Sequence, residues 1–110
     1  MASSLAPGEL FTLDSLITPT PQGIASRVLA RTAAGNITLF AFDAGEELAE
    51  HTAPFDALVL TLSGALVLTI GGVKVPTAPQ TIVLMPANIA HAVVATQPSQ
   101  MLLIMLREAS

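Results

Sequence analysis

Two histidines are the residues of this chain best suited to carry out chemistry. His51 and His91 are its only histidines, and the chain has no Cys, Tyr or Trp. A neutral imidazole binds divalent metal ions, and its pKa of about 6.5 also allows it to exchange protons near neutral pH. The missing cysteines exclude disulfides, thiolate metal sites and a cysteine nucleophile, and the missing tyrosines exclude a phenolic acid. These imidazoles are therefore the first candidates for a reaction site or metal site.

Each histidine lies close to the start of an expected strand. His51 precedes the apolar run 57–63, and His91 opens the run 91–95 after a turn at 86–88. In an antiparallel barrel both side chains can point inward and converge, which is the minimum for binding a divalent ion. Metal sites usually have three or four protein ligands, so the alternative is that a backbone carbonyl satisfies each ring at the mouth of the barrel.

The elements that position these residues are short apolar runs separated by turns. Gly, Pro and Asn punctuate the chain from Ile24 onward, which favours strands over helices. We expect strands at 24–32, 36–43, 57–63, 65–70, 73–75, 81–85, 91–95 and 101–106. Strands at this spacing leave no room for a crossover helix, so the sequence predicts an all-β antiparallel barrel or sandwich.

The first 23 residues have a different pattern. A small-residue stretch is followed by apolar residues at helical spacing, and Pro19 then ends any helix. The apolar residues are Leu10, Leu13, Leu16 and Ile17. We expect an N-terminal arm over 1–23, with a short helical turn, and a single barrel domain over 24–110.

Charge and hydropathy indicate which classes of partner the protein can bind. The chain has 110 residues, of which 52% are hydrophobic and 11% charged, and its net charge is −4. Its few basic residues form no stripe that could neutralise phosphates, so we expect no nucleic acid. Such sparse charge leaves apolar surface uncovered, which predicts a homodimer.

Two features bear on membranes and export. The first basic residue is Arg27, so the N-terminus lacks the basic region of a secretory signal, and we expect a cytoplasmic protein. Residues 57–73 contain no charged residue, and their number approaches the length of a membrane span. Ser63-Gly64 and Gly71-Gly72 divide this segment into strand-length pieces, so we expect a hairpin and no membrane span.

Residues 45–64 resemble the first motif of the cupin family. In that motif Gly is followed after five residues by His-x-His, then by Glu and, six residues later, by a second Gly. Gly45, His51 and Gly64 are in register with it. Ala53 stands at the second His position and Ala57 at the Glu position.

Residues 80–95 are similar to the second cupin motif. Pro86 and His91 match its Pro and His, while Gln80 and Asn88 replace its two glycines and Ala95 replaces its Asn. Asn is a tolerable replacement in a tight turn because it adopts the left-handed conformation more readily than other side chains.

The resemblance implies an all-β cupin-like barrel, also called a jelly roll or double-stranded β-helix. Cupin metal sites typically use three His and one Glu, and half of that set is alanine here. The resemblance therefore implies at most a weakly held divalent transition metal (Ni, Fe, Mn or Zn) on His51, His91 and water, and otherwise no cofactor. Asp56 precedes the Glu position by one residue, so strict alternation turns it to the opposite face unless a bulge intervenes.

Two roles are also possible for Met101 and Met105. They share one face of the last strand and either fill the core or offer soft thioether ligands.

Two functions follow from these observations. The first is a small-molecule-binding or sensing barrel with a pocket near His51 and His91; its predicted substrate-binding residues are Phe40, Phe42, Ala57, Val59 and Val93. The second is a metal-dependent enzyme, an oxygenase or isomerase acting on a small organic acid or aromatic compound. A structural dimer with a filled barrel is the third alternative.

Overall fold

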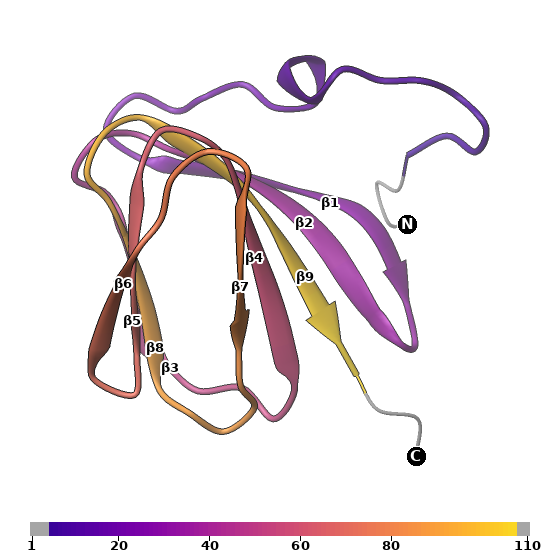
Figure 1. Cartoon of the computed structure of the whole chain (residues 1–110). Coiled ribbons are helices and arrows are strands. Elements are labelled where there is room, and N and C mark those ends of the chain that lie inside the picture. Colours follow the sequence, from indigo (N-terminus) through magenta and orange to yellow (C-terminus); the bar gives the residue numbers. More distant parts are fainter. Residues whose placement is uncertain (1–4, 108–110) are drawn as a thin grey trace.

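Two antiparallel β-sheets pack face to face in the computed structural model, which describes residues 5–107 (Figure 1). The strands are β1 (Ile24–Thr32), β2 (Gly35–Phe42), β3 (Glu47–His51), β4 (Asp56–Ser63), β5 (Leu66–Ile70), β6 (Val73–Pro76), β7 (Thr81–Met85), β8 (His91–Ala95) and β9 (Ser99–Leu106). One sheet has the order β1-β2-β9-β4-β7 and the other β3-β8-β5-β6. The predicted all-β barrel of antiparallel strands is confirmed.

One strand was not expected from the sequence. The other eight lie within two residues of their predicted bounds, whereas β3 falls in a segment that we assigned to no strand. Its sequence, ELAEH, is mostly exposed and has a single half-buried apolar side chain, Leu48. A strand with so little apolar character gives no periodic signal, and its pairing with β8 specifies it instead.

The chain passes repeatedly between the two sheets, and these connections bring several strand ends together at one end of the barrel. Segments 52–55 and 86–90 both connect a strand of one sheet to a strand of the other. The end of β3, the start of β4, the end of β7 and the start of β8 therefore meet at one end of the barrel. Because β9 runs antiparallel to β4, its C-terminal residues lie at the same end. We call this end of the barrel the histidine end.

The core lies between the sheets, and alternation along the strands directs side chains into it. In β9, Met101 is fully buried inside the main core cluster, with Leu103 and Met105 on the same face. Leu102, which points the other way, packs against a second cluster outside the five-stranded sheet. This strand therefore has apolar contacts on both faces, as its sequence predicts.

The N-terminal arm covers part of the outer face of the five-stranded sheet (Figure 1). It contains one 3-10 turn, Leu13–Leu16, and buried Leu16 packs against Leu29 and Leu39. The Leu5 N–H donates to the Leu29 carbonyl at 2.9 Å. The expected arm with a short helical turn is observed over residues 5–23, and residues 1–4 lie outside the described part of the chain. Within residues 5–107 no helix is long and apolar enough to span a membrane.

Gly64 is the residue that permits the tight connection from β4 to β5. Its φ angle is 78°, in the left-handed region that glycine adopts at little cost. A Cβ at this position would overlap the Ser99 hydroxyl and the Pro98 carbonyl oxygen. The requirement for glycine here is therefore both conformational and steric.

Candidate functional site

The two histidines lie side by side at the histidine end. His51 is the last residue of β3 and His91 the first of β8, and they are direct partners in the register of these strands. Their Nε2 atoms are 3.1 Å apart, with the ring planes inclined at 75°. His91 is buried, with 5% of its surface exposed, whereas His51 is exposed to solvent. The expected convergence of the two rings is observed.

A β-bulge contributes to this arrangement. The register of β3 against β8 shifts between Leu48 and His51. Bulges re-aim side chains that strict alternation would direct elsewhere. The shift lets both Leu48 and His51 line the interior although they are three residues apart.

Each histidine ring is held through its Nδ1 atom. His51 Nδ1 lies 2.8 Å from the Ala49 carbonyl oxygen, and His91 Nδ1 lies 3.2 Å from that of Ile89. A carbonyl oxygen only accepts hydrogen bonds, so each Nδ1 carries the hydrogen and each neutral ring has its lone pair on Nε2. In this tautomer both Nε2 atoms, which are 3.1 Å apart, are acceptors. A proton, a ligand donor or a cation between them would satisfy both.

Burial favours the neutral form of the inner ring. The pKa of His91 is lowered from its usual value, first by burial and then by the neighbouring His51, while the hydrogen bond to the Ile89 carbonyl opposes this shift. Burial and the neighbouring ring thus favour the neutral form of His91.

A cavity of about 290 Å³ opens beside the histidine pair. Its wall is almost entirely apolar and comes from both sheets. The large lining residues are two phenylalanines and three methionines: Phe40, Phe55, Met85, Met101 and Met105. The smaller apolar lining residues are Leu48, Ala53, Ala57, Val93 and Leu103. Of the residues that the structure describes, the two histidines contribute the only polar side chains to the wall. An apolar cavity of about 150 Å³ holds a benzene molecule, so this one has room for a ring with substituents.

Three of the five predicted pocket residues line this cavity: Phe40, Ala57 and Val93. Phe42 and Val59 do not, and the prediction for these two is corrected. Both point inward, but they lie further along their strands from the histidine end and are packed in the core with 2% and 1% of their surface exposed. Phe40 and Phe42 do share a face, with ring centroids 6.0 Å apart.

Sequence reasoning missed several lining residues. Leu48 belongs to the unexpected strand β3, and Phe55 to the connection before β4. Met85 ends β7, where it pairs with Ala57 of β4. Its inward direction depends on this register, which apolar periodicity in one strand does not reveal. Met101 and Met105, for which a core role and a site role were both open, line the cavity.

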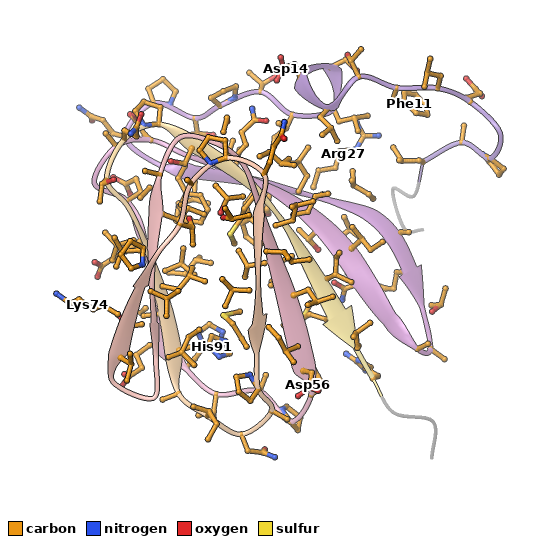
Figure 2. All side chains as sticks on the ribbon, in the orientation of Figure 1. Phe11, Asp14, Arg27, Asp56, Lys74 and His91 are labelled. Atoms are coloured by element: carbon orange, nitrogen blue, oxygen red, sulfur yellow. The ribbon has the colours of Figure 1, made fainter. Side chains whose placement is uncertain are left out.

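Asp56 does not join the site. Its Oδ1 atom accepts a hydrogen bond of 2.8 Å from the Ala87 N–H, and its side chain is exposed. Figure 2 shows Asp56 and His91 at the same end of the barrel. The carboxylate thus ties the start of β4 to the 86–90 turn, on the outward side that alternation predicts. In that turn Asn88 has a φ angle of 64°, the left-handed conformation expected for it, and its N–H donates to the Ala53 carbonyl at 2.7 Å.

The donor set differs from that of the four-ligand divalent centre implied by the cupin resemblance. Ala53 and Ala57 supply no ligand, and residues 5–107 contain no cluster of three or more His, Cys, Asp or Glu side chains able to hold a metal ion. Without a carboxylate, nothing in the cavity wall offsets the charge of a dication. The residues present do not fit such a centre, and the weakly held divalent ion stays a prediction.

Comparison with known proteins points to one family. The family model described as Cupin domain matches residues 38–106. No curated protein matches the chain. The crystal structure of a conserved protein of unknown function from Streptococcus pyogenes is 29% identical and superposes with a TM-score of 0.90, covering 99% of this chain and 96% of that one. A cupin superfamily protein from Desulfitobacterium hafniense is 30% identical, with a TM-score of 0.88 and coverage of 98% and 99%. A cupin 2 conserved barrel domain protein from Leptotrichia buccalis is 33% identical, with a TM-score of 0.84, and the match covers 88% of this chain and 47% of that one.

Proposed function

This chain belongs to the cupin family, and we propose that it is a small-molecule-binding barrel whose ligand occupies the cavity beside His51 and His91. The observation that carries the proposal is the pairing of an apolar cavity with two neighbouring Nε2 atoms at one end. Ligand sites of proteins typically combine an apolar wall with a few polar groups that fix orientation.

The chemistry of the wall defines the class of ligand. The apolar wall favours a hydrophobic body, and the cavity of about 290 Å³ limits it to one aromatic ring with substituents or an aliphatic chain of similar size. The facing Nε2 atoms favour a hydrogen-bond donor on that body, such as a hydroxyl or a protonated carboxyl group. Among residues 5–107 the wall has no polar side chain besides the two imidazoles, so a ligand with several charges is disfavoured.

Methionine methyl groups offer a direct test. All the methionines in residues 5–107 line the cavity, so protein labelled with ¹³C at the methionine methyl carbon reports on it. Phenol and toluene have nearly the same shape, but only phenol has a donor. We expect both to shift the signals of Met85, Met101 and Met105, with phenol binding at least several-fold more tightly.

Two variants sharpen the test. His51→Ala should reduce the preference for phenol over toluene, because it removes one of the two acceptors while the cavity remains. Glu50→Ala, an exposed neighbour that does not line the cavity, should leave the preference unchanged. Methyl signals that do not move with either compound at millimolar concentration would contradict the proposal.

A metal-dependent enzyme, an oxygenase or isomerase of a small organic acid or aromatic compound, is the second candidate. The short separation of the Nε2 atoms favours it, since two imidazoles at 3.1 Å can share one ion. Elemental analysis after growth with Ni, Fe, Mn and Zn tests it. One ion per chain that is lost in His51→Ala would support the enzyme, and metal far below one per chain would exclude it.

A further inference from the structure

The methionines at the histidine end are arranged around an alanine. Ala57 of β4 pairs with Met85 of β7 on one side and with Met105 of β9 on the other. Directly paired residues on neighbouring strands have Cβ atoms about 4.5–5.5 Å apart and point to the same face. The two thioethers therefore flank a single methyl group, and its small size leaves space above it into which both can turn.

The histidine pair lies on the opposite wall of the same cavity. Met85 and Met105 belong to the five-stranded sheet, and His51 and His91 to the four-stranded sheet, and all four side chains line the cavity. Facing sheets are about 10 Å apart, so inward side chains of this length meet near the midplane. The end of the barrel thus offers two sulfur and two nitrogen ligands, all neutral.

The absence of negative charge in this wall selects the ion. Within residues 5–107 no carboxylate lines the cavity, so a dication bound there would keep its full charge in an apolar environment. The desolvation cost of an ion rises with the square of its charge, so a monovalent ion incurs about one quarter of the cost. Thioethers are soft ligands and favour Cu(I), whereas carboxylates and water favour harder ions.

We propose that the two histidines, together with Met85 and Met105, form a site for Cu(I). For nitrogen ligands about 2.0–2.1 Å from an ion, the Nε2 separation of 3.1 Å corresponds to an N–ion–N angle of about 100°, close to tetrahedral. The Nδ1 hydrogen bonds to Ala49 and Ile89 hold both rings in the tautomer that ligation requires. The site does not depend on the organic ligand proposed above, and the two would compete for the same Nε2 atoms.

Competition with a coloured chelator tests the site. The protein is titrated anaerobically, in the presence of ascorbate, against the Cu(I) complex of bicinchoninate. We expect the wild type to withdraw one Cu(I) per chain. Met85→Leu and Met105→Leu should each weaken binding at least tenfold. Met101→Leu is the matched control: Met101 lines the same cavity but lies four residues along β9 from Met105, about 13 Å away. It should bind within twofold of the wild type.

A second measurement uses the unmodified sequence, so it does not depend on whether a variant folds. Cu(I) is diamagnetic, and its addition to protein with ¹³C-labelled methionine methyl groups should shift the signals of Met85 and Met105 and leave that of Met101 nearly in place. Equal amounts of Zn(II) should produce no such shift.

Several results would overturn the proposal. A wild type that withdraws no Cu(I) would remove the site altogether. Leucine variants at 85 and 105 that bind as tightly as the wild type would remove the methionines from it. Zn(II) bound as tightly as Cu(I) would refute the argument from charge and softness. Neither experiment contains phenol or toluene, so these results are separate from those of the phenol test.

Discussion

The two histidines are neighbours in space but differ in burial, and their replacement should affect stability very differently. His91 is 5% exposed, so His91→Ala enlarges the neighbouring cavity and leaves the Ile89 carbonyl without its donor. A buried truncation of this kind costs about 2–3 kcal/mol of the free energy of unfolding. His51 is exposed, and His51→Ala removes little more than one hydrogen bond to the Ala49 carbonyl, about 0.5–1 kcal/mol.

These energies translate into separable melting temperatures. For a domain of this size, 1 kcal/mol corresponds to about 4 °C, so His91→Ala should melt about 8–12 °C lower and His51→Ala about 2–4 °C lower than the wild type. The measurement is far-UV circular dichroism at pH 8, because a chain without Trp or Tyr has little intrinsic fluorescence. Glu50→Ala serves as the surface control. Equal losses for the two variants, or a larger loss for His51→Ala, would refute this account of the pair.

Three further predictions concern acid, the β4–β5 turn and self-association. Because the pKa of His91 is lowered in the folded state, the unfolded chain binds more protons once the pH falls below the ordinary value of about 6.5. The free energy of unfolding should therefore fall as the pH is lowered from about 6.5 to the pKa of the folded state, and this part of the decrease should be missing in urea titrations of His91→Ala. Gly64→Ala should lower the free energy of unfolding, measured in urea, by at least about 2 kcal/mol, because left-handed backbone strain adds to overlap with Ser99. Gly72 has open space around it, so Gly72→Ala should lower this free energy only by the strain, about 1–2 kcal/mol. The predicted homodimer should form through the outer face of β7, where Leu84 is 51% exposed. Light scattering should therefore show that Leu84→Lys is a monomer. A wild type that is monomeric at tens of micromolar would contradict this prediction.

The fold could be predicted from the sequence wherever apolar residues and turn residues alternate clearly. Strand β9 is an example, since MLLIML has apolar contacts on both faces in the structure. Strand β3 could not be found in this way. Four of its five residues are exposed, so its conformation depends on pairing with β8, a contact between segments 40 residues apart, as the His51 and His91 pair illustrates.

The candidate site was predictable in position and less so in composition. The strand pattern placed His51, His91 and Ala57 at one cavity, and alternation counted from the Glu position of the cupin motif turned Asp56 away from it. The row of Met85, Ala57 and Met105 could not be derived, because it depends on the register of three strands that are distant in sequence. Periodicity within one strand gives the face of a residue but not its neighbours across the sheet.

The two edges of the five-stranded sheet are protected unequally, and this difference limits how the molecule can assemble. At β1 the edge carries Arg27 and Arg31, a register irregularity, and the hydrogen bond from Leu5 of the arm. At the other edge, β7 has no further strand beside it in the described part of the chain and contains no charged residue. Addition of β7 to β1 of another copy would repeat without end and build a fibre, whereas β7 against β7 closes after two copies. Because the arm partly covers the β1 edge, this sheet favours the self-limiting contact through β7.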